Sequence, residues 1–271
     1  MKKFISSKAL LAVFLLALAA PATVSAAASL EITPSMQSSL DKTIAGATQS
    51  QASKIKSQYN EFLTFQNQDK DWDAKISALY KENVEKETAL NKQIKEIDAA
   101  KLAKLEAEVT QARERYKPLF SHYTALNKQI EAARLLKNKD LNSMLRFQAN
   151  ALRIPVQLAR MDIKAEEEAS REAKDKTSKT MKKIRGTLAD IDPINVQIKA
   201  KKGAIRTTET SITPLWSAFK QAVKKGDAQG ILSSLAPLIS LSRQINEEKE
   251  KIIKLETKIS EIIAIAKAQV P

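Results

Sequence analysis

The 271-residue chain contains no cysteine, one histidine and five glycines, and only 5% of its residues are aromatic. The absence of cysteine excludes disulfides, thiolate metal ligands and a cysteine nucleophile. With His122 as the single histidine, a zinc site lacks its usual ligands, and no spacing supports a Ser-His-Asp set. We therefore expect no catalytic residue, no metal site, no cofactor and no small-molecule substrate, and we do not interpret the chain as an enzyme.

The scarcity of glycine also bears on the fold. Five glycines in 271 residues fall well below the average glycine content of about 7%. Alanine, lysine, glutamate, glutamine, leucine and isoleucine dominate instead, and all but isoleucine are strong helix formers. No segment has the alternating pattern of a strand. The composition predicts an all-α fold of long helices, arranged as an elongated antiparallel bundle or as coiled-coil hairpins.

Long hydrophobic runs are also lacking, except at the N-terminus. Lys2, Lys3 and Lys8 accompany an apolar run over 9–20, Pro21 follows, and small residues at 24–26 suit a signal peptidase. We expect a cleaved signal peptide over 1–26 and a secreted protein of a Gram-positive bacterium, either released or held non-covalently at the cell surface. No second run of about twenty apolar residues suggests a transmembrane helix.

Apolar residues recur at alternating intervals of four and three in three long segments, which is the heptad pattern of packed helices. The first series comprises Leu105, Val109, Ala112, Tyr116, Leu119, Tyr123, Leu126, Ile130 and Ala133. The second comprises Leu145, Ala149, Leu152, Val156, Ala159 and Ile163, and the last helix, expected over 228–267, carries Ile245, Ile252, Leu255, Ile259, Ile262 and Ala266. The helices can pair within one chain, or between chains by self-association.

Turn residues suggest where the helices end. We expect a first helix over 35–65, a break at 67–69, turns at 138–140, 190–193 and 226–230, and short helices between the last two turns. Pro118 and Pro155 can each be a kink within a helix or a corner between helices. We divide the rest of the chain into 27–186, a long coiled-coil region, and 187–271, a basic helical region that packs on it or forms one domain with it.

Positive charge is concentrated in one segment. The chain carries a net charge of +14, and residues 174–225 contain thirteen Lys/Arg and four Asp/Glu, a local net charge of +9. Such a field attracts polyanions, so we expect the segment to contact an anionic cell-envelope polymer, anionic lipid or extracellular DNA; the alternative is a generally basic surface. The candidate polyanion-binding residues are Lys182, Lys183, Arg185, Lys199, Lys201, Lys202, Arg206, Lys220, Lys224 and Lys225.

The apolar residues of 214–242 have two interpretations. They can form core contacts between the C-terminal helices, which we favour, or they can face a membrane beside the basic segment. The candidate membrane-facing residues are Leu215, Trp216, Phe219, Ile231, Leu232 and Leu235.

A weak motif precedes the long helices. Asp69, Asp71 and Asp73 have the spacing that opens a calcium loop, but Ala74 and Tyr80 stand where the loop needs glycine and glutamate. We therefore interpret Asp71 and Asp73 as residues at a helix start.

These features together favour a secreted, non-enzymatic helical protein with a structural or binding role at the cell surface or in the extracellular matrix. The alternative is a secreted helical-bundle toxin or antibacterial effector that acts on membranes through 214–242.

Overall fold

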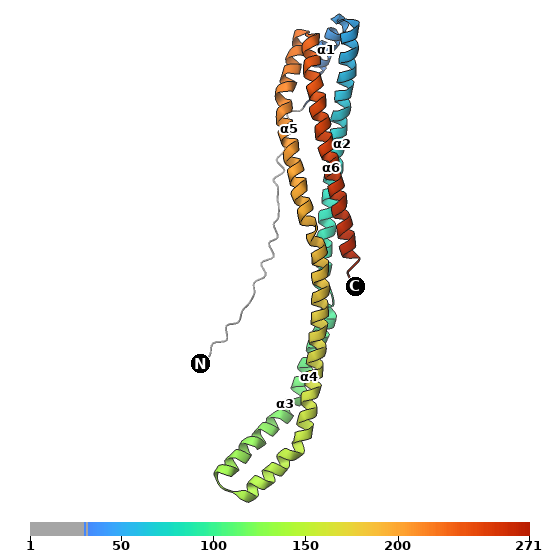
Figure 1. Cartoon of the computed structure of the whole chain (residues 1–271). Helices are drawn as coiled ribbons and strands as arrows, with labels where there is room; N and C mark the ends of the chain where they lie inside the picture. Colours follow the sequence, from blue (N-terminus) through green and yellow to red (C-terminus); the bar gives the residue numbers. More distant parts are fainter. Residues whose placement is uncertain (1–29, 31) are drawn as a thin grey trace. The chain divides into compact units, whose positions relative to one another are not determined.

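The computed structural model describes residues 30 and 32–271, and this part of the chain forms six helices and no strand (Figure 1). In order they are α1 Pro34–Gly46, α2 Gln49–Glu96, α3 Ala99–Leu135, α4 Lys139–Ala189, α5 Ile191–Lys225 and α6 Ala228–Lys267. The predicted all-α class, with long helices paired in antiparallel hairpins, is confirmed. The signal peptide expected over 1–26 lies outside the described residues.

The helices form two compact units that alternate along the chain. Unit 1 comprises the described residues of Met1–Thr64 together with Thr207–Arg243, and unit 2 comprises Phe65–Arg206 and Gln244–Pro271. Helices α2, α5 and α6 therefore each contribute to both units. The boundary expected between 186 and 187 lies within unit 2.

The core of unit 1 contains large aromatic and aliphatic side chains. Phe62 of α2 stacks on Trp216 of α5 with ring centroids 5.8 Å apart, and Trp216 stacks on Phe219 at 5.2 Å. Leu40 of α1 and Leu235 of α6 are fully buried in the same unit. Each such side chain stabilises the unit by about 1.5–3 kcal/mol through burial alone.

A tight turn joins α5 to α6 in unit 1. Gly226 has φ +69°, a left-handed conformation that glycine adopts without strain. The Asp227 carboxylate then accepts a hydrogen bond from the Gly230 N–H at 2.9 Å, which caps the start of α6. The turn predicted at 226–230 is therefore confirmed.

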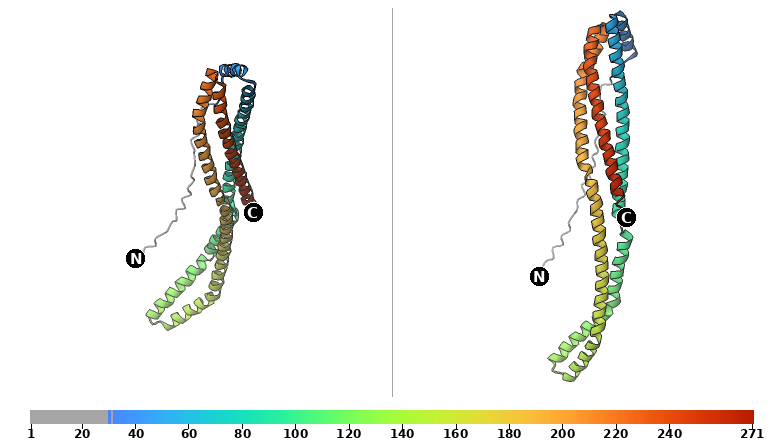
Figure 2. Two further views of the ribbon diagram at one scale, coloured as in Figure 1. Left: turned by 45° about the horizontal axis from the view of Figure 1, so that its top comes forward. Right: turned by 45° about the vertical axis from the view of Figure 1, so that its right-hand side comes forward.

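Helices α3 and α4 form an antiparallel hairpin in unit 2, visible in both views of Figure 2. Near its end the buried residues of the two predicted heptad series meet in one apolar cluster: Leu126, Ile130 and Ala133 from α3, and Leu145 and Ala149 from α4. The connection runs through Leu136 to Asn138, close to the predicted turn. The Asn138 side chain accepts a hydrogen bond from the Leu141 N–H at 3.1 Å and so caps α4.

The rest of unit 2 is formed by the second part of α2, the first part of α5 and the second part of α6. Its core is rich in isoleucine, which packs well in heptad positions. The buried isoleucines of this part are Ile94, Ile191, Ile194, Ile198, Ile205, Ile245, Ile252, Ile259 and Ile263.

Both internal prolines of the hairpin lie inside continuous helices, Pro118 in α3 and Pro155 in α4. Neither is a corner between helices. Proline removes one helical hydrogen bond and crowds the preceding turn, which bends a helix, and the hairpin is bent along its length (Figure 1).

Two expected interruptions are wrong. The break expected at 67–69 lies within α2, and the short helices expected between 190 and 226 are one helix, α5. Contacts distant in sequence support α2 here, since the Asn246 side chain donates a hydrogen bond to the Phe65 carbonyl at 3.0 Å. The actual interruptions follow Gly46 and lie at Asp98, which has φ +55°.

Candidate functional site

The predicted polyanion-binding residues divide between the two units. Unit 2 contains seven of them: Lys182, Lys183 and Arg185 at the end of α4, and Lys199, Lys201, Lys202 and Arg206 on α5. Unit 1 contains the other three, Lys220, Lys224 and Lys225. All ten side chains are exposed except Lys201, which is half-buried. We call Lys182, Lys183, Arg185, Lys199, Lys202 and Arg206 the basic row.

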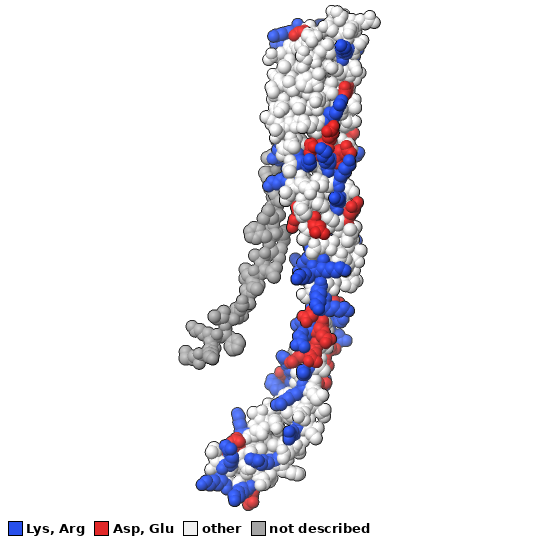
Figure 3. Space-filling view, viewed as in Figure 1, with Lys and Arg blue, Asp and Glu red and all other residues white. Residues whose placement is uncertain are grey.

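The basic row is linear because α4 leads almost directly into α5. Asp190, the residue between the two helices, keeps a right-handed helical conformation with φ −65° and ψ −10°. From Lys182 to Arg206 the row therefore extends about 36 Å at 1.5 Å per residue. Figure 3 shows Lys and Arg side chains gathered along this stretch of α4. The cations form two groups, 182–185 and 199–206, because residues 186–198 contain no Lys or Arg. Such an array can contact separate stretches of one extended polyanion.

Lys201 differs from the basic row because its charge is neutralised within unit 2. Its ammonium lies 2.9 Å from Glu248, which also pairs with Lys251 at 2.6 Å. The hydrogen bond from Lys251, followed by that from Lys201, lowers the pKa of Glu248 below its usual value. In contrast, Lys182, Lys183, Arg185 and Lys199 form no salt bridge with any described residue. These four cations are available to a ligand.

Two of the three lysines of unit 1 have a second explanation. Lys224 and Lys225 lie in the last turn of α5, where cations interact favourably with the negative end of the helix dipole. The basic row of unit 2 is therefore the better candidate for ligand binding.

The candidate membrane-facing residues lie inside unit 1. Trp216, Phe219, Ile231 and Leu235 are buried, and Leu215 and Leu232 are half-buried. Their packing between α2, α5 and α6 corresponds to the core interpretation, and it leaves the membrane interpretation without a large exposed hydrophobic residue in 214–242.

Two of the three aspartates near residue 70 bind a lysine. The Lys249 ammonium lies 2.6 Å from Asp69 and 2.7 Å from Asp73. Lys249 is 5% exposed, so this buried cation requires anionic partners. The two carboxylates thus have a role within unit 2. No cluster of three or more potential metal ligands occurs among the residues that the structure describes.

A different apolar surface lies at the end of the α3–α4 hairpin. Twelve large hydrophobic side chains are exposed among the described residues, and eight of them lie between 135 and 161. Six exposed apolar residues of α4 recur at intervals of 3-4-3-4-3 and form what we call the outer seam: Met144, Phe147, Ala151, Ile154, Leu158 and Met161. Sequence reasoning missed this surface, although its spacing is readable in the sequence.

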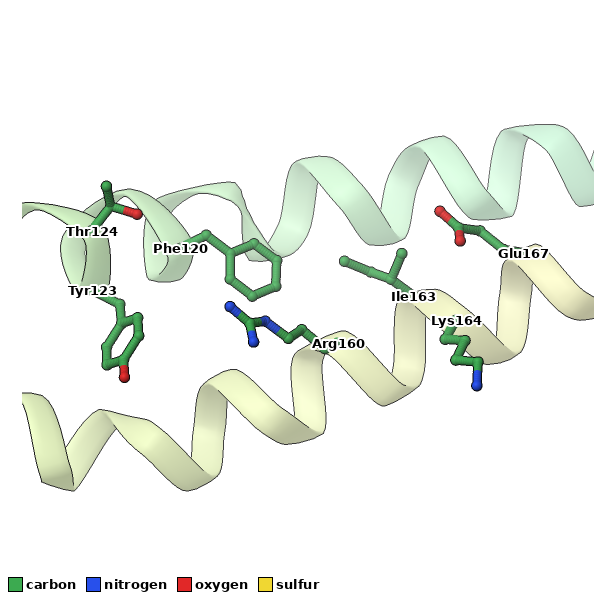
Figure 4. Close-up of a pocket in the computed structure, with 7 residues that line it drawn as sticks. All are labelled: Phe120, Tyr123, Thr124, Arg160, Ile163, Lys164 and Glu167. Carbon is green, nitrogen blue, oxygen red and sulfur yellow. The ribbon is translucent and has the colours of Figure 1, made fainter.

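A shallow groove of about 330 Å³ separates α3 from α4 beside this surface. In Figure 4 the Phe120 ring and the Arg160 guanidinium point into the space between the helices, with Tyr123 nearby, whereas Lys164 extends away. Glu167 is held by Arg113 at 2.6 Å. The groove can accept an apolar or anionic group, but its lining offers no nucleophile with an adjacent base.

Within the described part of the chain, no helix is both long enough and apolar enough to cross a bilayer. Comparisons with known protein families, with curated proteins and with solved structures find no significant match to this chain.

Proposed function

We propose that this protein is a secreted, non-enzymatic helical protein that binds phosphate-rich anionic polymers of the bacterial cell envelope through the basic row. The observation that carries the proposal is the linear series of exposed cations over 182–206, of which Lys182, Lys183, Arg185 and Lys199 are not neutralised by described residues.

The charge distribution supports an extended ligand rather than a compact one. The cations follow one helical path of about 36 Å instead of converging on a point. A polymer that neutralises several of them releases its counterions, so its binding weakens steeply as salt is added. Teichoic acids are polymers of this kind at a Gram-positive surface, and extracellular DNA shares the repeated phosphate.

Binding of a long-chain polyphosphate and of purified teichoic acid across a salt series tests this proposal. Replacing Lys182, Lys183, Arg185 and Lys199 by glutamine removes four cations. We expect the affinity at physiological salt to fall at least about tenfold, and the slope of log affinity against log salt to become shallower by about 3, since each phosphate contact contributes about 0.7–0.9.

The matched control replaces four exposed lysines outside the basic row, Lys54, Lys56, Lys92 and Lys95, by glutamine. This variant has the same net charge as the test variant. If both variants lose the same affinity, the protein binds through its overall charge and the basic row is not a site.

A further inference from the structure

The hairpin end carries an apolar surface that its own fold leaves uncovered. Within the outer seam, Phe147 is 77% exposed and Ile154 and Met161 are each 67% exposed. Leu135 and Leu136, at the connection between α3 and α4, are 77% and 78% exposed. Contiguous exposure of this kind marks an interaction site more often than scattered apolar residues do.

The buried and exposed stripes of α4 lie on different sides of the helix. Leu145 and Ala149 face the apolar cluster shared with α3, whereas the outer seam is offset from them by one to two residues at every heptad. At 100° per residue the centre of the outer seam lies roughly 150° from the buried stripe. The outer seam therefore points away from α3, and packing within the hairpin cannot cover it.

The charge around the outer seam indicates what can cover it. Residues 128–160 contain seven Lys/Arg and two Asp/Glu, a net charge of +5. Two of these cations, Lys137 and Lys139, are exposed at the helix connection next to Leu135 and Leu136. Figure 3 shows Lys and Arg side chains among uncharged surface on this end of the hairpin. The partner that fits is apolar inside and negatively charged at its surface.

We infer that the end of the α3–α4 hairpin binds the surface of an anionic lipid bilayer, with the outer seam in the interface and the exposed lysines of the helix connection, Lys137 and Lys139, at the lipid phosphates. Helices with an apolar stripe and flanking cations lie in the plane of such an interface. Apolar burial and attraction to anionic headgroups then act together.

A second copy of the chain fits this surface less well. A symmetric pair formed by two outer seams brings two regions of net charge +5 together, and like charges in one interface repel. Leu135 and Leu136 also lie at the helix connection, outside the seam that a partner helix would cover. The proposed lipid-binding surface at the hairpin end does not overlap the basic row. Lipid binding by the hairpin end and polyanion binding by the basic row can therefore fail separately.

Cosedimentation with vesicles at physiological salt tests the inference. The test variant replaces Phe147, Ile154 and Leu158 by glutamine, a good helix former, at exposed positions. The matched control replaces Val84, Val196 and Ile265, which are exposed outside the hairpin end, by glutamine. Circular dichroism and thermal denaturation verify that both variants remain folded.

We expect the wild-type protein to bind vesicles in which about one-third of the lipid is phosphatidylglycerol, and to bind pure phosphatidylcholine vesicles more weakly. The test variant should lose at least about tenfold in partitioning, because three apolar side chains no longer enter the interface. The control variant should bind like the wild type, and polyphosphate binding should be unchanged in both.

Two results overturn the inference. If the test variant keeps its vesicle binding but sediments as a smaller species than the wild type, the outer seam joins two copies of the chain. If the glutamine variant of the basic row loses vesicle binding and the test variant does not, the basic row alone contacts the lipid.

Discussion

At the scale of single residues, the fold depends on polar groups that are buried together with their partners. Asn83 donates a hydrogen bond to the Glu256 carboxylate at 2.9 Å, and Glu256 is 1% exposed. Lys249 is buried between Asp69 and Asp73. These partners are more than 170 positions apart in the chain, so no local pattern could have predicted the pairs. The aspartate spacing resembles a calcium loop, but the partner of Asp69 and Asp73 is Lys249, which lies far away in sequence.

Glu256 gives unit 2 a specific pH dependence. Burial, the largest influence, raises the pKa of Glu256, although Asn83 and Lys202 act in the opposite direction. The pKa of Glu256 in the folded protein therefore exceeds its unfolded value of about 4.5. Because the folded state binds this proton more tightly, the stability that the protonated form contributes is lost as pH rises through the folded pKa. Glu256→Gln should raise the melting temperature relative to the wild type at neutral pH, and by less at about pH 4.

Glu250→Gln supplies a control of opposite sign, measured in the same thermal denaturation series. The hydrogen bond from Lys254 lowers the pKa of Glu250 on an exposed surface. Any stabilisation by this carboxylate is present at neutral pH and lost in acid, so the variant should not gain stability at neutral pH. An equal melting-temperature change for Glu256→Gln at both pH values contradicts the role assigned to burial.

At the scale of helices, heptad spacing predicted the hairpin and α6 well, because apolar intervals report directly which residues one helix buries. The stripe of α4 predicted to pack, which begins at Leu145, is the one that faces α3. The second stripe, which begins at Met144, was missed, because a single segment does not reveal that a further apolar stripe stays exposed. The break expected at 67–69 failed for a related reason, since contacts from α6 support α2 there.

Two glycines should respond oppositely to substitution by alanine. Gly226 has φ +69°, where a side chain is strained, so Gly226→Ala should reduce stability by about 1 kcal/mol. Gly186 lies inside α4, and an added Cβ meets nothing within 4 Å, so Gly186→Ala should increase stability by about 0.5–1 kcal/mol. Urea denaturation of both variants tests these two predictions. A change in stability of the same sign in both variants contradicts the placement of Gly226 in a left-handed turn and of Gly186 inside a helix.

At the scale of the whole molecule, both candidate surfaces belong to the same unit. The exposed cations of the basic row and the exposed apolar residues of the outer seam both lie in unit 2, on helices that also supply its core. The charge asymmetry was readable from the sequence, whereas the membrane contact was considered for other residues. The residues first considered for that contact are buried in unit 1, because the folding partners of 214–242 come from α1 and α2.

Chemical labelling of surface lysines with and without polyphosphate, read by mass spectrometry on the wild-type chain, tests whether the basic row is the polyanion-binding surface. We expect bound polyphosphate to protect Lys182, Lys183, Lys199 and Lys202 from acylation, while Lys54, Lys56, Lys92 and Lys95 react as before. All eight lysines are exposed in the free protein. Uniform protection of both sets, or protection of the second set alone, would contradict the assignment of the basic row as the polyanion-binding surface.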